Sequence, residues 1–204
     1  MNITFIGGGN MASALISGLL QQGYEARQLR VVEISAENRE KLKHAFGVLV
    51  VADLASAVTD SDIILLSVKP QQLHELAQEL APLLDNQLII SIAAGIRATD
   101  IMRWLGGYAR VVRAMPNTPS LVRSGVAGLY AAPDASEHDR KNAEAILSAV
   151  GSILWVDEEE MLHAVTAISG SGPAYIFYFI ESMQQAGIEL GLTPVQARQL
   201  VCRH

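Results

Sequence analysis

Cysteine is nearly absent from this chain: Cys202 is the single cysteine among 204 residues. One thiol forms no disulfide within the chain and completes no cysteine-based zinc cluster. The five histidines are scattered without the spacing of metal ligands. We therefore expect no metal site, and a chain suited to a reducing compartment such as the cytoplasm.

Positive charge is also sparse. The sequence has 15 Lys plus Arg against 21 Asp plus Glu, a formal net charge of -6, and the cations are spread singly. A protein that binds nucleic acid usually gathers its cations into a patch that neutralises phosphates. We therefore expect no nucleic-acid partner.

The first 24 residues contain no charged side chain. A secretory signal needs a positively charged start, which residues 1–2 do not supply. Glycines at 7–9 also interrupt the apolar run where a strand should give way to a helix. We expect neither a signal peptide nor a membrane helix, hence no membrane partner and a cytoplasmic location.

Hydrophobic residues make up 50% of the sequence, enough for a buried core. Short β-branched runs alternate with helical patterns up to residue 157, and only helical patterns follow. This order predicts an α/β fold: a Rossmann-like, doubly wound parallel sheet over 1–157, then the start of an all-helical domain over 158–204. The predicted strands are 2–6, 30–34, 48–51, 63–68, 88–92, 110–114, 125–131 and 152–156. The predicted helices are 12–20, 36–46, 70–84, 99–105, a segment capped by Ser136, 158–168, 173–189 and 194–201.

A glycine motif of the form Gly-x-Gly-x-x-Ala follows the first predicted strand and opens a helix. Gly7 permits a tight turn, Gly9 lets a pyrophosphate approach the backbone, and Ala12 keeps the helix close to the strand. A glycine-rich turn without a ligand is the alternative, which the strand and helix on either side make less favourable. The residues expected to bind a dinucleotide here are Gly7, Gly8, Gly9, Asn10 and Met11.

Glu33 ends the second predicted strand, where an acidic side chain usually accepts hydrogen bonds from the ribose 2′-hydroxyl. Alone, it favours NAD(H). Ser35, Asn38 and Arg39 follow, and they could receive a 2′-phosphate if Glu33 turns away. The choice between NAD(H) and NADP(H) therefore stays open.

Three further segments follow predicted strands, and ligands bind at the carboxyl ends of the strands in this fold. Small residues after the fifth strand suit a flat nicotinamide ring, and a lysine after the fourth suits ribose or phosphate oxygens. The alternative for each segment is an ordinary strand-to-helix turn. The candidates are Val68, Lys69 and Pro70; Ala93, Ala94 and Gly95; and Met115, Pro116, Asn117 and Thr118.

A Ser-Gly-Ser-Gly-Pro-Ala-Tyr segment, residues 169–175, precedes the longest predicted helix. Pro173 suits a first helical position, which would leave hydroxyls and free backbone N–H groups to hold a carboxylate. A hinge or a simple helix cap is the alternative.

These motifs, in this order, resemble those of pyrroline-5-carboxylate reductases from residue 1 to about 200. The resemblance implies hydride transfer from NAD(P)H to the C=N carbon of 1-pyrroline-5-carboxylate, giving L-proline in proline biosynthesis. It also implies a helical dimerisation domain and a homodimer or larger homo-oligomer. By the resemblance, the residues that position the substrate are Asn117, Thr118 and Ser171, with Met115, Pro116, Ser169, Gly170 and Gly172.

The sequence departs from the family pattern twice. Glu33 stands where the family usually has small or basic residues suited to NADPH. The family also continues through further helices with a Thr-Ser-x-Gly-Gly-Thr-Thr-like segment, which these 204 residues lack. We therefore expect this chain alone to lack part of the dimer surface and of the substrate site.

Two alternatives remain at this point. One is a cofactor-binding, dimerising chain without catalysis. The other is a hydroxy-acid or arogenate-type dehydrogenase of the same fold, for which only His163 could serve as the acid–base residue of the helical domain.

Overall fold

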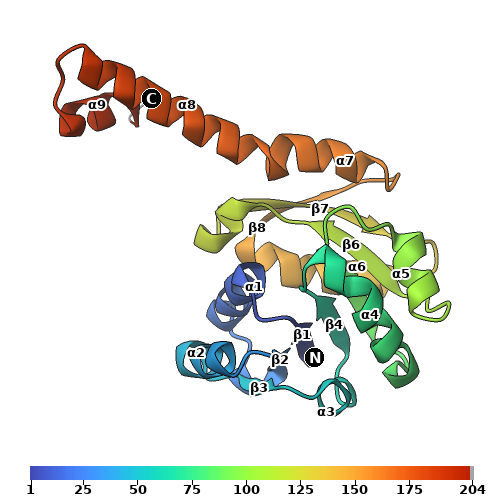
Figure 1. Ribbon diagram of the computed structural model, residues 1–204. Helices are drawn as coiled ribbons and strands as arrows, with labels where there is room; N and C mark the ends of the chain where they lie inside the picture. Colours follow the sequence, from blue (N-terminus) through green and yellow to red (C-terminus); the bar gives the residue numbers. More distant parts are fainter. Residues whose placement is uncertain (203–204) are drawn as a thin grey trace.

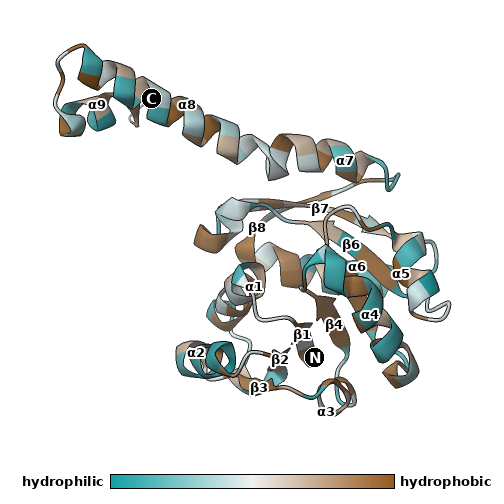
Figure 2. Cartoon of the chain, viewed as in Figure 1, coloured by the Kyte–Doolittle hydropathy of each residue, from teal (hydrophilic) through white to brown (hydrophobic). Residues whose placement is uncertain are grey.

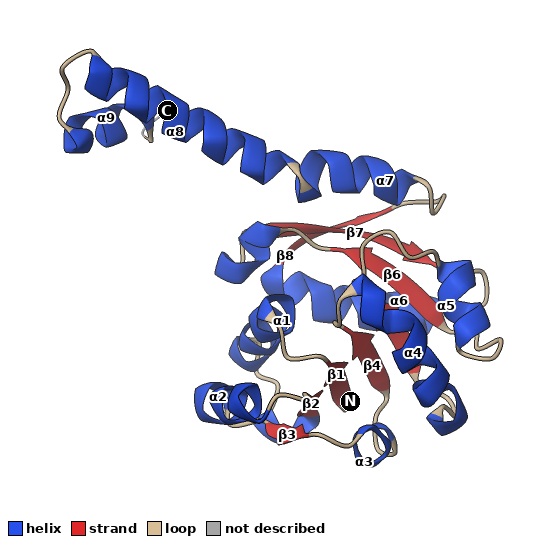
Figure 3. Ribbon diagram, in the orientation of Figure 1, coloured by secondary structure: helices blue, strands red, loops and turns tan. Residues whose placement is uncertain are grey.

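A computed structural model describes residues 1–202 and centres on one eight-stranded sheet (Figure 3). The strand order is β3-β2-β1-β4-β5-β6-β7-β8. All neighbouring pairs are parallel except β6 and β7, which are antiparallel. The strands are β1 (Ile3–Ile6), β2 (Leu29–Val32), β3 (Leu49–Val51), β4 (Ile63–Leu66), β5 (Leu88–Ser91), β6 (Val111–Met115), β7 (Gly125–Ala131) and β8 (Gly151–Trp155).

Helices cover both faces of the sheet because its central strands are apolar on both sides. In β4, Ile63 and Leu65 join the core beneath α1 and α6, whereas Ile64 and Leu66 join the core beneath α3, α4 and α5. The helices of this part are α1 (Asn10–Gln21), α2 (Ala36–Phe46), α3 (Leu54–Val58), α4 (Pro70–Leu80), α5 (Ala98–Trp104) and α6 (Glu137–Leu147). Short 3₁₀ helices occupy Ala26–Gln28, Ala81–Leu83, Thr118–Val122 and Ser148–Val150.

Local sequence sets several helix starts. The Ser35 hydroxyl accepts a hydrogen bond from the Asn38 N–H and caps α2. Ser136 and Asp139 form a reciprocal capping box at α6. Pro70 is the first residue of α4, where its missing N–H costs nothing.

The chain after β8 forms a helical arm that extends away from the sheet beyond β7 and β8 (Figure 1). The arm consists of α7 (Met161–Val165), a π-helical turn (Thr166–Gly170), α8 (Gly172–Glu189) and α9 (Pro194–Val201). No residue of α8 is buried, although much of the helix is apolar (Figure 2). Within residues 1–202, no helix is both long enough and apolar enough to cross a bilayer.

The predicted α/β class, with a Rossmann-like sheet followed by helices, is confirmed, and all eight predicted strands are present. Three details differ. The β6–β7 pair is antiparallel, because the two strands are joined only by a short segment that contains a 3₁₀ turn, whereas parallel neighbours need a longer crossover. The helix Leu54–Val58 is absent from the prediction, and the predicted helix 70–84 divides into α4 and a 3₁₀ turn.

Candidate functional site

A groove of about 420 Å³ opens at the carboxyl ends of β1, β2 and β4. The glycine motif forms one wall: Gly7 has φ +100°, and a Cβ there would lie 2.9 Å from the Ser67 carbonyl oxygen. The Ser67 hydroxyl lies within hydrogen-bonding distance of the carbonyl oxygens of Ile6 and Gly7, at 3.0 and 2.7 Å. Strand β4 therefore fixes the loop closely, and only glycine fits at position 7.

Gly9, by contrast, has open space in front of it, with no heavy atom within 4 Å of a Cβ built there. Gly9 directly precedes α1, whose first residues are Asn10 and Met11. The free N–H groups at the start of a helix, next to a glycine with open space in front of it, form a binding site suited to a pyrophosphate. The residues present therefore fit a dinucleotide.

Glu33 also lines this groove and is held by three donors. Its carboxylate accepts hydrogen bonds from the N–H of Ser35 (2.9 Å), the side-chain amide of Asn38 (2.8 Å) and the N–H of Gly8 (3.1 Å). Partial burial raises the pKa of Glu33, but the hydrogen bonds from Ser35, Asn38 and Gly8 together outweigh it and leave the pKa below its ordinary value. Glu33 is therefore a fixed anion at neutral pH.

The neighbours of Glu33 that could receive a phosphate make protein contacts. The Arg39 guanidinium donates to the carbonyl oxygens of Glu33 and Ile34, at 3.0 and 2.8 Å. Ser35 caps α2, and the Asn38 amide also donates to the Gly8 carbonyl oxygen at 3.1 Å. Of the predicted residues, the groove lining brings together Gly7, Gly8, Gly9, Glu33, Val68 and Lys69.

Helix α4 contributes a wall of the groove that the sequence interpretation missed. Gln72, Glu75, Leu76 and Glu79 all line it. Their spacing of three and four residues, on a helix that starts at the groove, is the signal that could have revealed them. Glu75 and Glu79 add negative charge to the groove that Glu33 lines, and among the described residues 1–202 Lys69 is the one cation in the lining.

A second cluster joins the end of β6 to the helical arm. A Cβ on Gly170 would lie 3.2 Å from the Met115 side-chain methyl, so the arm's glycine packs directly on the rim of the sheet. Asn117 is 8% exposed, and its side-chain oxygen accepts a hydrogen bond from the Val126 N–H at 2.9 Å. An open, mainly apolar hollow of about 520 Å³ lies here, lined by Asn117, Pro119, Ile168, Ser169, Gly172, Pro173, Tyr175, Ile176 and Phe177.

The Ser-Gly segment differs in detail from the predicted set of free N–H groups. Helical backbone continues from α7 through the π-helical turn, and the Ser171 N–H donates to the Thr166 carbonyl oxygen at 2.8 Å. The Ser169 hydroxyl donates to the Val165 carbonyl oxygen at 2.8 Å. Pro173 is accordingly the second residue of α8 rather than the first. In a π-helical turn an N–H group donates to the carbonyl oxygen five residues earlier. N–H groups that would be free at the start of a separate helix are therefore already hydrogen-bonded here.

The remaining predicted residues lie between or beside these clusters. Ala93, Ala94 and Gly95 follow β5, which lies between β4 and β6 in the sheet. Gly95 has φ +77°, a conformation that favours glycine. Pro116 follows β6, and Thr118 begins the next 3₁₀ turn. Residues 93–95 therefore lie between the groove formed by the glycine motif and the second cluster, where Met115 meets Gly170.

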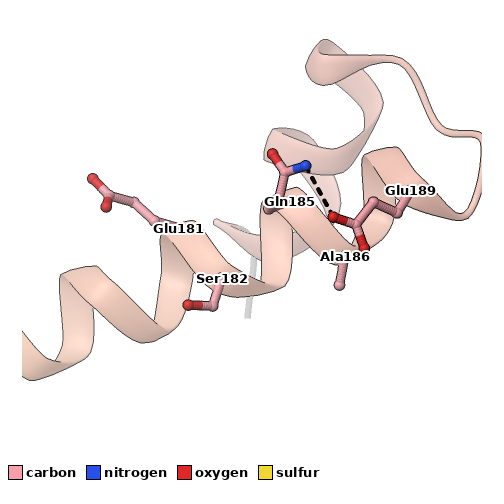
Figure 4. Close-up of a pocket in the computed structure, with 5 residues that line it drawn as sticks. All are labelled: Glu181, Ser182, Gln185, Ala186 and Glu189. Atoms are coloured by element: carbon pink, nitrogen blue, oxygen red, sulfur yellow. Dashed lines mark hydrogen bonds between the residues drawn. The ribbon is translucent and has the colours of Figure 1, made fainter.

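Two other features fall outside the candidate site. Within the described chain, residues 1–202, no three His, Cys, Asp or Glu residues are grouped closely enough to hold a metal ion. A shallow hollow on α8, shown in Figure 4, is lined by Glu181, Ser182, Gln185, Ala186 and Glu189. The Gln185 amide donates to Glu189 there at 3.1 Å, and the hollow contains no predicted site residue.

The sheet order, the glycine loop and the groove at the carboxyl ends of the strands define a Rossmann-type dinucleotide-binding protein. Residues 2–95 match the family described as NADP oxidoreductase coenzyme F420-dependent, and residues 159–204 match the family described as pyrroline-5-carboxylate reductase dimerisation. The chain is 49% identical over 199 residues to pyrroline-5-carboxylate reductase from Pseudomonas aeruginosa and 43% identical over 200 residues to that from Haemophilus influenzae. These matches cover 97% and 98% of this chain and 73% of each relative. The chain belongs to the pyrroline-5-carboxylate reductase family.

Solved structures agree. A pyrroline-5-carboxylate reductase from Coxiella burnetii superposes with a TM-score of 0.93 at 41% identity, covering 98% of this chain and 75% of that one. The Plasmodium falciparum pyrroline carboxylate reductase with NADP bound gives 0.88 at 29% identity, covering 100% and 75%. Prephenate dehydrogenase from Aquifex aeolicus, at 17% identity and a TM-score of 0.71, shares the fold alone.

Proposed function

We propose that this protein reduces 1-pyrroline-5-carboxylate to L-proline with hydride from NADH or NADPH. The observation that carries the proposal is the contact between Gly170 and Met115, which brings the Ser-Gly segment of the arm against the rim of the sheet. Family membership and the dinucleotide groove support the same reaction.

The nicotinamide cofactor, when bound, supplies the hydride. The glycine loop would hold its pyrophosphate, with Gly9 leaving room and the start of α1 offering N–H groups. Lys69 would interact with ribose or phosphate oxygens, and the small residues at 93–95 would leave space for a flat ring. The proposed cofactor-binding residues are Gly7, Gly8, Gly9, Asn10, Met11, Glu33, Ser35, Val68, Lys69, Pro70, Ala93, Ala94 and Gly95.

The chain's own residues would act on the substrate mainly by positioning. Reduction of a cyclic imine needs a protonated ring nitrogen more than a strong protein base, so orientation and charge stabilisation suffice. The hydroxyl of Ser171 and the segment around it would hold the substrate carboxylate, while Asn117, fixed by Val126, would border the ring. The proposed substrate residues are Met115, Pro116, Asn117, Thr118, Ser169, Gly170, Ser171 and Gly172.

A second copy of the chain is the proposed macromolecular partner. The aromatic and aliphatic side chains at the start of α8 are exposed, with values of 56–73% between residues 175 and 179. A helix with this many exposed apolar side chains is typical of an association site. We also propose a division at 157/158 between the Rossmann and helical domains, and a cytoplasmic location.

The direct test is to mix the protein with pyrroline-5-carboxylate and each reduced nucleotide and to follow nucleotide oxidation. We expect proline formation with a stoichiometry of one nucleotide per proline. Nucleotide binding by calorimetry without turnover would instead favour the cofactor-binding, dimerising chain without catalysis. In a parallel assay with a hydroxy acid and NAD⁺ or NADP⁺, oxidation of the hydroxy acid with no imine reduction in the first assay would favour the dehydrogenase alternative.

A further inference from the structure

A single carboxylate oxygen of Glu159 joins three parts of the chain. Glu159 lies in the connection between β8 and α7. Its Oε1 accepts hydrogen bonds from the Arg113 guanidinium and from the Ala98 N–H, both at 2.6 Å. The ion pair is largely buried, since the Arg113 side chain is 7% exposed and the Glu159 side chain 13%.

Each partner belongs to an element that leads to the candidate site. Ala98 is the first residue of α5, which follows the proposed nicotinamide segment 93–95. Arg113 lies in β6, two residues before Met115. Glu159 lies two residues before α7, which leads through the π-helical turn to the Ser-Gly segment. The pair therefore links the cofactor side, the substrate rim and the arm.

Apolar contacts also place the start of the arm on the sheet. Leu162 is buried, a Cβ on Gly128 would lie 2.8 Å from the Val165 side chain, and Gly170 lies against Met115. Beyond Gly172 the helix α8 has no buried residue and projects from the sheet (Figure 1). The angle at which the Ser-Gly segment meets the rim is therefore set near residues 159–170.

The chemistry of the Arg113–Glu159 pair suits a role in orienting the arm better than a role in stability alone. Within residues 1–202, the buried Arg113 Nε has no hydrogen-bond partner, and Glu159 is the carboxylate that pairs with this guanidinium. Replacing a buried ion pair by apolar residues of similar size is often neutral or stabilising, because desolvation offsets the attraction. What a short charge-assisted hydrogen bond adds is a fixed distance and direction.

We propose that Arg113 and Glu159 are positioning residues for the reaction, which hold the Ser-Gly segment of the arm in register with the Met115–Thr118 rim. This proposal rests on the proposed reductase function. It predicts that weakening the pair impairs use of the imine substrate while nucleotide binding, which depends on the glycine groove, is preserved.

The first test is Glu159→Gln, which keeps an acceptor for the Ala98 N–H but removes the charge. We expect KM for pyrroline-5-carboxylate to rise about tenfold or more, since a small misplacement of binding groups is costly, with the nucleotide Kd within about twofold of the original protein. Glu160→Gln is the matched control: its carboxylate lies 3.8 Å from Arg97 in an exposed pair, and we expect both constants to stay unchanged. An unchanged KM in Glu159→Gln overturns the proposal.

A second comparison separates positioning from stability. Arg113→Met leaves Glu159 unpaired and is expected to lower the melting temperature, and Arg113→Met combined with Glu159→Gln removes both charges and should restore it. A positioning role requires KM to stay raised in the double variant although stability returns. Recovery of KM together with stability overturns the proposal. Absence of turnover in the unaltered protein, by contrast, contradicts the proposed function itself.

Discussion

The Glu33 carboxylate accepts a hydrogen bond from the Gly8 N–H at 3.1 Å, so the end of β2 is tied to the glycine loop that follows β1. This bond places a fixed negative charge in the groove, and the pKa of Glu33 lies below its ordinary value because its hydrogen bonds outweigh the effect of burial. Glu75 and Glu79 line the same groove. A 2′-phosphate would add a further charge of about -1.5 to -2 beside these carboxylates, as phosphate monoesters do at pH 7.

We therefore predict that the protein prefers NADH and that Glu33→Ala shifts its selection toward NADPH. The ratio of kcat/KM for NADH to that for NADPH should fall by about tenfold or more, equivalent to roughly 1.4 kcal/mol. Glu37→Ala, which removes an exposed carboxylate paired with Lys41 on α2, is the control. A ratio unaffected by Glu33→Ala would refute the assigned role.

Substituting alanine for the neighbouring glycines Gly8 and Gly9 should change different properties: stability at Gly8 and nucleotide affinity at Gly9. A Cβ on Gly9 meets no atom within 4 Å, so Gly9→Ala should fold normally yet weaken nucleotide binding by about tenfold or more, because the methyl occupies the space for the pyrophosphate. A Cβ on Gly8 would clash with the buried Leu42 side chain and approach Glu33, so Gly8→Ala should destabilise the fold by about 1–3 kcal/mol.

Calorimetric titration with nucleotide and thermal unfolding together separate the two glycine variants. Gly9→Ala must lose affinity at an unchanged melting temperature. Equal affinity in Gly9→Ala and the unaltered protein would mean that the pyrophosphate does not approach this loop.

Asp139 should control part of the stability in acid. It is 1% exposed and forms an ion pair with Arg110 at 2.6 Å. Burial raises the pKa of Asp139, but hydrogen bonds from Arg110 and Ser136 outweigh it, so the folded-state pKa is depressed. A depressed folded-state pKa gives stability that is present above the unfolded value of about 4 and is lost as the pH falls through the folded value.

We predict that Asp139→Asn lowers the free energy of unfolding at pH 7 by about 2–3 kcal/mol, because Arg110 remains and is only partly exposed to water. The difference from the unaltered protein should begin to shrink below about pH 4, where the aspartate is protonated in the unfolded state, and should disappear as the pH falls through the depressed folded-state value. Urea unfolding across this pH range measures it. Asp100→Asn, in the exposed pair with Arg103, is the control and should change little.

The sequence predicted the sheet well because its signals are local. Residues 63–66 are continuously apolar, as a strand buried on both faces must be, and Gly7 follows a strand and precedes a helix. The Arg113–Glu159 pair was not predictable in the same way, since its partners are 46 residues apart and each reads alone as an ordinary charge. The donors used inside the π-helical turn were also missed, because Pro173 reads as a helix start whether or not helical backbone precedes it.

The exposed face of α8 carries the last prediction, that the chain self-associates through this helix. Phe179 is 63% exposed and follows four other exposed apolar or aromatic residues. Burying an aromatic ring at a dimer contact typically contributes more than about 1 kcal/mol. Phe179→Asp should therefore raise the dimer dissociation constant by about tenfold or more, as measured by sedimentation velocity over a concentration series. Lys141→Asp, which places the same carboxylate on the exposed surface of α6, should leave the constant unchanged. If both variants dissociate like the unaltered protein, this face of α8 is not the contact between copies.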